Sequence, residues 1–421
     1  MTEGTWVLAL FSIFLTPLAA AGLALINAGL GRSRSAAHTM LASLCVIGVA
    51  ALAYLTCGFA WQSFAAGASH TSLIAGKPWS WIGAGPLFLR GMLWDTSAAP
   101  LILLLGMFSA GLSATIPLGA GSDRWRLSAS LLSTALFAGF TYPLFAHWVW
   151  GGGWLQQMGV NCGLSRGFLD TGGAAVFHVS GGLTALSIAW ILGPRRGKYS
   201  DGMPAAIPGH NGILVLFGCL LALVGWLGLN AAGAVLFNGV TPGGGVVLVA
   251  VNTLLAAGAA CLTTAALTRS RYGRPDASLC ANGWVGGLVA SSAIASLVNP
   301  LAAALIGTIA GALVAFSVEI LDLRLALDDP AGAISVHGVA GIWGLLAAGV
   351  FGSGDWLAQT GGVATLLGFV FPLSYAINWT LNRFYPQRVA PDGERQGMDL
   401  HELGAGAYPE FVTHHEDFLS R

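Results

Sequence analysis

The feature that most constrains the fold is a series of apolar runs, each about 20 residues long, that recurs along the whole chain. A run of this length can cross a hydrocarbon core of about 30 Å as an α-helix. Only 9% of the residues are charged, whereas a soluble domain normally carries about 25%. The sequence therefore predicts an all-α integral membrane protein.

About eleven such runs are expected transmembrane helices. They are Trp6–Ala28, Thr39–Trp61, Ala98–Ala120, Leu127–Val149, Gly172–Leu192, Asn211–Leu236, Gly243–Leu267, Ser278–Val298, Leu301–Ile320, Ala331–Phe351 and Gly361–Phe384. The first run could instead be a signal peptide, because Leu18–Ala21 offers small residues for cleavage. The segment before it has Glu3 and no Lys or Arg, which favours a retained helix.

The basic residues indicate how the chain is oriented. If the N-terminus is outside, the outer loops hold only Lys77, Arg90 and Arg166. The other side holds Arg32, Arg34, Arg124, Arg126, Arg195, Arg196, Lys198, Arg269, Arg271, Arg274, Arg324, Arg383, Arg388, Arg395 and Arg421. Because cytoplasmic loops carry excess Lys and Arg, we expect a multi-pass protein of the cytoplasmic membrane with an outside N-terminus and a cytoplasmic tail. Basic residues that follow topology in this way do not favour a nucleic-acid role.

One sequence pattern occurs twice. Asp170 precedes His178 by eight residues, and Asp329 precedes His337 by eight; Gly182 and Gly341 each follow the histidine by four. In the expected topology these two helices run in opposite directions, which predicts inverted five-helix repeats and a ligand site between them. The expected parts are a transmembrane domain (1–384) and a cytoplasmic tail (385–421). The domain comprises repeat one (about 6–192), repeat two (about 211–351) and a final helix (361–384).

The two histidines are the main candidates for a pore. A histidine inside an apolar helix is costly unless it has a polar partner or lines a cavity. A lone one could simply bond a backbone carbonyl, but matched positions in two repeats favour a shared site. Neutral imidazole offers one donor and one acceptor to a small polar guest. Two histidines without a nearby carboxylate or thiolate are a poor metal site, so no metal or cofactor is expected.

Further polar and aromatic residues lie toward the outer ends of the expected helices. Asp170 suits the N-cap of the fifth helix, and its charge would also make an outer mouth attractive to cations. Trp150, in the cluster His147–Gly153, is either an interfacial tryptophan or a cation–π surface. Trp226 and Asn230 fall in the outer half of the sixth helix, where they could line the same vestibule.

At these residues the chain resembles the ammonium transporter (Amt/Mep/Rh) family, on the Amt side. The matching segments are Gly22–Ser33, His147–Gly153, Leu169–His178, Gly225–Ala231, Asp328–Gly341, Gly397–Leu400 and Ala407–Pro409. The resemblance implies a homotrimer in the lipid bilayer with one pore per subunit. Trp150 would recruit ammonium, Asp170 would hold the outer site together, and His178 and His337 would conduct ammonia and the proton. The tail and loops resemble those bound by a PII-type signalling protein.

The chain also departs from the family pattern, which has two stacked phenylalanines as a gate. The helix-six gate position is Leu229, and helix three offers Leu105 and Phe108 as gate candidates, with Ser109 one residue away. The family's outer-site serine aligns with Gly233. The helix-eight Thr-Pro of the family is replaced by Ser292-Ala293.

Three functions remain open from the sequence. The first is transport of ammonium or ammonia. The second is an ammonium sensor or regulatory membrane protein with little flux, which the altered gate and recruitment positions favour. The third is a channel for another small molecule, such as methylamine or carbon dioxide. The sequence offers no nucleophile–base pair or phosphate loop, so we expect no enzymatic activity.

Overall fold

The computed structural model describes residues 1–64, 67–200 and 203–409. Within these ranges, eleven helical segments are long and apolar enough to cross a membrane, which confirms the predicted class and number of crossings. The segments are Glu3–Leu30, Ser33–Gln62, Ala98–Gly121, Leu127–Cys162, Ala174–Leu192, Gly212–Asn238, Gly244–Tyr272, Ala277–Ile294, Pro300–Leu323, Ile334–Phe351 and Trp356–Phe384. Most limits differ from the predicted ones by a few residues, whereas the fourth segment continues well past Val149.

The segments are built from the following helices and short connecting helices. The first half contains α1 (Glu3–Leu15), α2 (Pro17–Leu30), η1 (Ser33–Ser35), α3 (Ala36–Ala53), η2 (Tyr54–Gly58), α4 (Phe59–Gln62), η3 (Leu87–Leu89), α5 (Ala98–Gly121), α6 (Leu127–Leu136), η4 (Phe137–Thr141), α7 (Tyr142–Trp150), α8 (Trp154–Cys162), η5 (Ala174–Val179) and α9 (Ser180–Leu192). The second half contains α10 (Gly212–Asn238), α11 (Gly244–Tyr272), α12 (Ala277–Ile294), α13 (Pro300–Leu323), η6 (Ile334–Val339), α14 (Ala340–Phe351), α15 (Trp356–Thr365), η7 (Leu366–Val370), α16 (Phe371–Phe384), α17 (Pro391–Gln396) and η8 (Asp399–Leu403).

Wide π-helical turns interrupt several spans. Two of them, η4 and η7, end two residues before Pro143 and Pro372. Proline lacks an N–H and its ring crowds the carbonyl four residues earlier, so a wider turn relieves the clash. The π turns η5 and η6 have no such proline, yet each contains one of the paired histidines. Their matched positions fit the two predicted repeats, and π turns often occur at functional sites.

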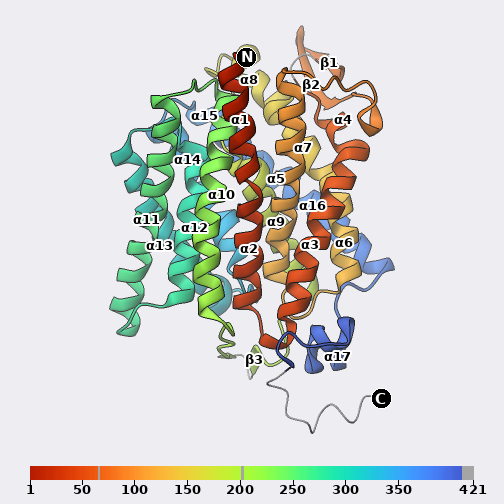
Figure 1. The fold of residues 1–421 in the computed structure, drawn as a ribbon, viewed down its shortest axis with the longest axis vertical. Helices are drawn as coiled ribbons and strands as arrows, with labels where there is room; N and C mark the ends of the chain where they lie inside the picture. Colours follow the sequence, from red (N-terminus) through yellow and green to blue (C-terminus); the bar gives the residue numbers. More distant parts are fainter. Residues whose placement is uncertain (65–66, 201–202, 410–421) are drawn as a thin grey trace.

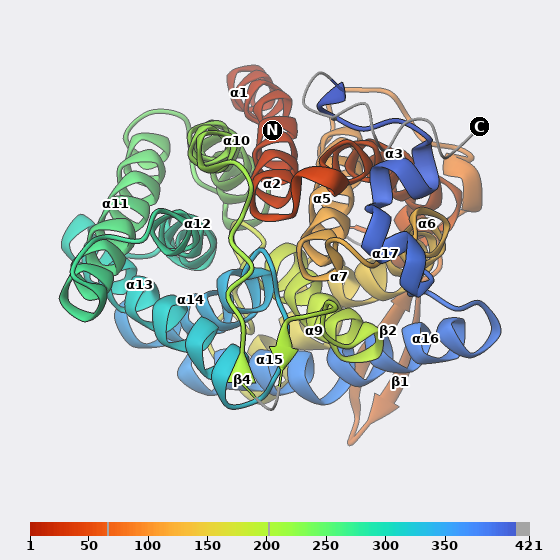
Figure 2. The same cartoon turned by 90° about the horizontal axis from the view of Figure 1, so that it is seen from below.

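The helices stand side by side with the N-terminus at one end of the bundle and the tail at the other (Figure 1). Viewed from the tail end, α9 and α14 lie near the middle, and α11 and α13 lie at the edge (Figure 2). The edge helices expose large apolar side chains such as Leu262 and Leu301, as expected for surfaces in contact with lipid tails. The third and fifth spans, in contrast, are mostly buried.

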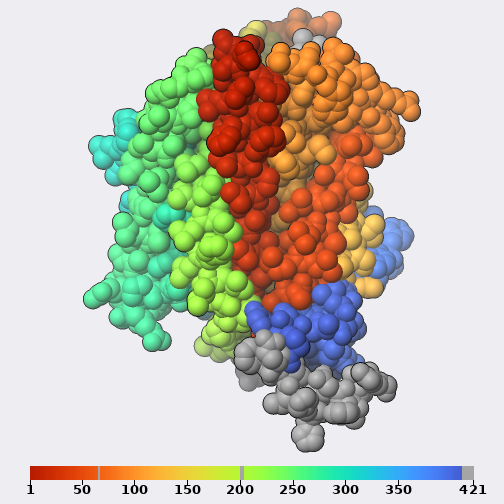
Figure 3. Space-filling model, in the orientation of Figure 1, coloured from red at the N-terminus to blue at the C-terminus, as the bar shows by residue number. Residues whose placement is uncertain are grey.

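Two small hairpins and an ordered tail segment complete the fold. The hairpin β1 (Ser69–Ile74) and β2 (Lys77–Gly83) pairs antiparallel within the long loop between the second and third spans, and β3 (Tyr199–Ser200) pairs with β4 (Met203–Pro204). The sequence analysis did not predict these strands. The tail segment with α17 packs under α3 at the end opposite the N-terminus (Figure 3).

Candidate functional site

The two histidines predicted to form a pair do lie side by side. Their ring centroids are 5.4 Å apart and their planes are tilted by 32°. His178 is fully buried and His337 is 3% exposed. Within the described part of the chain, both ring nitrogens of His178 and Nδ1 of His337 have no hydrogen-bonding partner. Buried polar atoms normally have partners, so this arrangement leaves donors and acceptors available to a small polar guest.

Close backbone contact between the two repeats brings the histidines together. A Cβ atom built on Gly182 would lie 2.5 Å from the backbone nitrogen of Gly338. Gly182 is one turn after His178, and Gly338 directly follows His337. Only glycine permits this approach. The glycine that the sequence pattern singled out therefore sets the distance between the two histidine helices.

Two aspartates cap the two histidine helices in the same way. Asp170 Oδ2 accepts hydrogen bonds from the backbone N–H groups of Ala175 and Val176, at 2.9 and 3.0 Å. Asp329 accepts from Ala333 and Ile334, at 3.0 and 2.7 Å. These contacts agree with the predicted cap, in which a carboxylate satisfies free N–H groups at a helix start. Asp170 Oδ1 has no bonding partner within residues 1–64, 67–200 and 203–409.

The widened turn that contains His178 keeps its backbone groups bonded. Ser113 Oγ donates to the carbonyl of Phe177 at 2.5 Å, and Ser180 Oγ donates to the carbonyl of Ala175 at 3.0 Å. A π turn disturbs the regular hydrogen-bond ladder of the helix, and buried carbonyls left without partners are costly. The two serines therefore stabilise the turn and hold the backbone of Phe177 and His178 in place.

A cavity of about 450 Å³, the vestibule, opens beside Asp170. Trp150, Asp170, Thr171, Phe237 and Asn238 are among its lining residues. The structure thus brings the predicted recruitment residues Trp150 and Asp170 to one cavity. Trp150 Nε1 donates to the backbone carbonyl of Asp170 at 2.8 Å, so the two residues are also directly bonded.

Two aromatic rings pack on Trp150. Phe237 stacks on it in parallel, with centroids 4.2 Å apart and planes 3° apart. Phe177 meets it edge-on at 5.2 Å and also stacks on Tyr142 at 6.1 Å. The sequence analysis missed these three aromatic residues. Phe237 could have been found, because Trp226, Asn230, Gly233 and Phe237 recur at the spacing of one helix face.

Trp226 and Asn230 are fully buried close to the histidine pair and to the start of the fifth span. Trp226 stacks on the His178 ring, with centroids 4.9 Å apart and planes 10° apart. The Asn230 amide donates to Thr253 Oγ1 and Ser291 Oγ, both at 2.9 Å. Trp226 therefore lies against His178 of the histidine pair, deeper than the vestibule wall that the sequence analysis expected.

The predicted gate positions are apolar and packed. Leu105 is 1% exposed and Leu229 is fully buried, and both belong to the main hydrophobic core. Phe108 is partly buried against the same core, and the neighbouring Ser109 hydroxyl lies 3.0 Å from the Tyr142 hydroxyl. The aromatic residue that contacts both Trp150 and His178 is Phe177, with ring centroids 5.2 and 6.2 Å away, and Phe177 also stacks on Tyr142.

A small cavity lies on the other side of the histidine pair. Its lining includes Asn27, Asn282, Ala331 and His337, and its volume is about 10 Å³, which suits about one water-sized molecule. Because the spans that begin near Asp170 and near Ala331 start on opposite sides of the bundle, this cavity continues the path away from the vestibule. Asn27 and Asn282 are therefore further candidate path residues that the sequence analysis missed.

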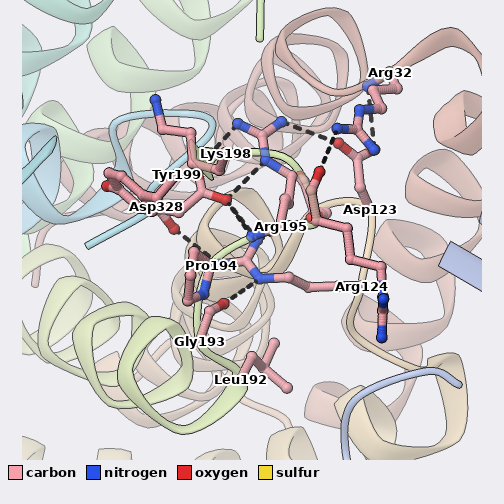
Figure 4. A network of polar contacts seen from close by, with 12 residues as sticks. Arg32, Asp123, Arg124, Leu192, Gly193, Pro194, Arg195, Lys198, Tyr199 and Asp328 are labelled. Atoms are coloured by element: carbon pink, nitrogen blue, oxygen red, sulfur yellow. Dashed lines mark hydrogen bonds and ion pairs between the residues drawn. The ribbon is translucent and has the colours of Figure 1, made fainter. Parts of the chain in front are cut away.

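The tail end of the bundle has a buried ion network (Figure 4). Arg195 bonds Asp123 through Nη1 at 3.0 Å and Asp328 through Nε and Nη2 at 2.9 and 3.0 Å. Arg124 donates to the backbone carbonyls of Gly193 and Asp328 at 2.7 and 2.8 Å. The network thus ties the end of the fifth span to Asp328, which directly precedes the cap of the His337 helix.

The tail docks on the same surface. Glu394, 2% exposed, accepts from the backbone N–H of Arg196 at 2.6 Å and from Arg388 Nη2 at 2.7 Å. Arg388 in turn donates to the carbonyls of Leu192 and Pro194. Asp399 accepts from the backbone N–H groups at the start of α3. These bonds join the tail to the ends of the second and fifth spans.

The fold and the site define a class of protein. The described residues contain no group of three or more His, Cys, Asp or Glu able to hold a metal ion. They contain a bundle of helices long and apolar enough to span a membrane, with a vestibule at one end, a buried histidine pair and a small cavity beyond the pair. This is the architecture of a transporter or channel for a small solute.

The comparisons with known proteins identify the family. The chain matches the model of the Ammonium Transporter Family over residues 5–408 and belongs to this family. It is 36% identical to the ammonium transporter Amt2 of Archaeoglobus fulgidus, over 97% of this chain and 88% of that protein. It is 32% identical to an ammonium transporter of Bacillus subtilis, over 97% of this chain and 100% of that protein.

Solved structures agree with this assignment. A protein described as a sensor Amt protein matches with a TM-score of 0.85 and 27% identity, over 94% of this chain and 98% of that one. Candida albicans Mep2 matches with a TM-score of 0.80 at 23% identity, over 99% of this chain and 92% of that one; at this identity the likeness concerns the fold. The family match and the sequence relatives confirm the Amt/Mep/Rh resemblance stated from the sequence, and the solved structures confirm the fold.

Proposed function

We propose that the chain transports ammonium or ammonia across the cytoplasmic membrane along the path from the vestibule past His178 and His337. The observation that carries the proposal is the buried imidazole pair, 5.4 Å between centroids, with ring nitrogens unpartnered among the described residues. The named ammonium transporters among its relatives support the choice of solute.

The physical chemistry favours deprotonation of ammonium before the histidine pair. Moving a bare cation into a buried, weakly polar path costs many kcal/mol. Removing a proton from an acid about two pH units below its pKa costs only about 3 kcal/mol. Ammonium therefore splits into ammonia and a proton, and both cross along the histidine pair, which offers donors and acceptors to the neutral molecule.

Each site residue has a role in this scheme. Trp150 recruits the cation through its indole ring. Asp170 caps the fifth span and holds the Trp150 indole through its carbonyl, and its buried Oδ1 has no partner among the described residues. Trp226 fixes the ring orientation of His178 by stacking on it. His178 and His337 conduct.

The proposal extends to topology and assembly. The N-terminus lies outside and the tail is cytoplasmic, because the basic residues concentrate on the tail side. The transmembrane domain covers 1–384 and the tail 385–421. By family resemblance the chain forms a homotrimer, and a PII-type signalling protein is the expected partner at the tail surface.

The test compares the wild-type protein with His178→Ala/His337→Ala in proteoliposomes on a solid-supported membrane. We expect a transient current on addition of ammonium that the double variant lacks. Reconstitution of the variant at equal protein content, checked by electrophoresis, is the control. A wild-type protein that gives neither a current nor a stopped-flow pH change inside the vesicles would overturn the transport proposal.

A second candidate function is ammonium sensing with little flux. It is favoured by the likeness to a structure described as a sensor Amt protein and by the buried leucines at two gate positions. Ammonium binding seen by calorimetry, without a current or a vesicle pH change, would support sensing. Saturable flux would support transport.

A further inference from the structure

We infer that Phe237 is a specificity-determining residue of the outer site: its ring is a displaceable cover on the indole of Trp150. A cation reaches the indole face that Phe237 covers only when the Phe237 ring moves away. The inference rests on the proposed function, because it concerns the same recruitment site.

The geometry around Trp150 leaves one movable neighbour. Phe237 covers one indole face at 4.2 Å with the planes 3° apart. Phe177 packs edge-on at 5.2 Å and is only 2% exposed. The indole N–H is bonded to the carbonyl of Asp170. Of these contacts, only the Phe237 ring is partly exposed and borders the vestibule.

The stacked rings leave no room for a cation. A cation–π contact requires the cation over the ring face, within about 6 Å of the ring centroid. Two parallel rings 4.2 Å apart are in van der Waals contact, so nothing fits between them. A cation that binds this face of Trp150 must therefore take the place of Phe237.

The position of Phe237 in the chain allows this movement. It is the penultimate residue of α10, which ends at Asn238 and is capped by Gly239, whose φ is +67°. A glycine-rich loop with Gly243, also at positive φ, follows. The vestibule of about 450 Å³ beside the ring has space for a phenyl group. Rotation of the side chain, or loosening of the last helical turn, would uncover Trp150.

The cover has a consequence for selectivity. A stacked aromatic pair changes an equilibrium constant by about two- to tenfold, so every cation meets this penalty before it contacts the face of Trp150 that Phe237 covers. A larger cation such as methylammonium needs more of the space that Phe237 occupies than ammonium does. Phe237 therefore weakens the binding of methylammonium more than that of ammonium.

The selectivity arm of the test compares Phe237→Ala with the wild type. We expect the half-saturating concentration of methylammonium to fall about two- to tenfold, and that of ammonium to fall less. Phe237→Tyr keeps a flat ring and should behave as the wild type. Leu236→Ala is the matched control. Leu236 precedes Phe237 in the sequence and also borders the vestibule, whereas the ring stacked on Trp150 is that of Phe237.

A second arm needs neither transport nor ammonium binding. Caesium ions quench indole fluorescence on contact. The chain has 15 tryptophans, so the contribution of Trp150 is obtained as the part of the quenching that is lost in Trp150→Phe. This part measures the access of cations to Trp150. We expect this part to grow in Phe237→Ala and to stay at the wild-type level in Phe237→Tyr. Growth of this part in a protein without flux would support the cover while the transport proposal fails.

Two results would overturn the inference. One is caesium access to Trp150 that is the same in Phe237→Ala and the wild type. The other is cation binding that is weaker in Phe237→Ala than in the wild type, and as weak as in a Trp150→Leu variant. Phe237 would then be part of the binding surface rather than its cover.

Discussion

The ring of His178 lies 5.4 Å from the ring of His337, and Gly182 lies directly against Gly338 one turn further along the first of these two helices. The distance between the histidine rings and the contact between the glycines have the same origin in the fold. The approach of the backbones at the glycines fixes how far apart the imidazoles can be. The histidine distance therefore depends on a residue that itself carries no chemistry.

The first prediction concerns Gly182→Ala. Its new methyl group would lie 2.5 Å from the Gly338 nitrogen, which forces the two helices apart. We expect the ammonium-evoked current to fall at least tenfold, because small displacements of reacting groups are costly. The thermal midpoint of the detergent-solubilised protein should also fall, as in other overpacked cores.

Gly338→Ala is the matched control for that prediction. A Cβ atom on Gly338 would meet no heavy atom within 4 Å. The substitution changes the other glycine of the contact, but its methyl group would point into open space, so we expect the thermal midpoint to stay at or above the wild-type value. Equal effects of the two alanines on that midpoint would contradict this account of helix approach.

The second prediction concerns Gly233→Ser, which restores the residue type of the family's outer site. A Cβ atom there would lie 2.1 Å from the carbonyl oxygen of Thr171. We therefore expect weaker ammonium binding and about 1–3 kcal/mol of lost stability, rather than better recruitment. Calorimetry and thermal unfolding measure both quantities, with Gly258→Ser, at an open position, as the control. Tighter ammonium binding by Gly233→Ser would show that the loop can move to accommodate the serine.

The sequence predicted the parts of this protein that follow from periodicity and from matched motifs. Long apolar runs predict the membrane-spanning helices directly, because a helix must have about that length to cross the bilayer. The repeated Asp-to-His spacing of eight residues predicted the pairing of His178 and His337, since inverted repeats bring equivalent positions together.

Other parts could not be predicted because they depend on how side chains pack between distant spans. The spacing of α10 places Phe237 on the same helix face as Trp226, but no local pattern predicts that it stacks on Trp150, 87 positions away in the chain. The depth of Trp226 against His178 likewise depends on the rotation of α10 about its axis. The β1–β2 hairpin is stabilised by its contacts with helix ends, for example the bond from Ser80 to Gln157, and its own sequence is a weak strand signal.

The third prediction concerns the ion network at the tail end. Arg195→Met removes the hydrogen-bonded partner of two carboxylates, Asp123 and Asp328, that are about 1–2% exposed, and leaves Asp328 with Arg124 Nη1 at 3.8 Å. Leaving buried charges unpaired costs about 3–5 kcal/mol, so we expect a large fall in the thermal midpoint. Arg271→Met is the control: its pair with Glu319 is partly exposed, and such pairs contribute about 1 kcal/mol or less. Equal effects of the two substitutions would contradict the importance of burial.

The fourth prediction is a pH dependence at Asp328, which lies in a loop. Burial raises the pKa of its carboxyl group, but hydrogen bonds from Arg195 and the charges of Arg124 and Arg195 outweigh burial and hold the pKa below its usual range. A lowered folded-state pKa stabilises the fold above the unfolded-state pKa of about 4, and this contribution is lost as pH falls through the folded-state pKa. We expect the thermal midpoint to fall below about pH 4 in the wild type and to fall less steeply in Asp328→Asn. If the thermal midpoint depends on pH in the same way in both proteins, groups other than Asp328 cause the loss of stability at low pH.

The last prediction concerns the contact of the tail with the fifth span. Glu394 is nearly inaccessible and bonds both Arg388 and the backbone N–H of Arg196, whereas Asp392 is 79% exposed at the side chain and pairs only with the neighbouring Arg395 among the described residues. Glu394→Gln keeps the shape but loses the charge that holds Arg388 against the carbonyls of Leu192 and Pro194. We expect hydrogen exchange of backbone amides in 386–400 to rise at least tenfold in this variant, because hydrogen bonds to charged groups contribute about 1.5–3 kcal/mol. Asp392→Asn should leave exchange within about twofold of the wild type. If both substitutions raise exchange equally, the tail is held by its other contacts, such as those of Asp399 with α3, and Glu394 has no special part in docking it.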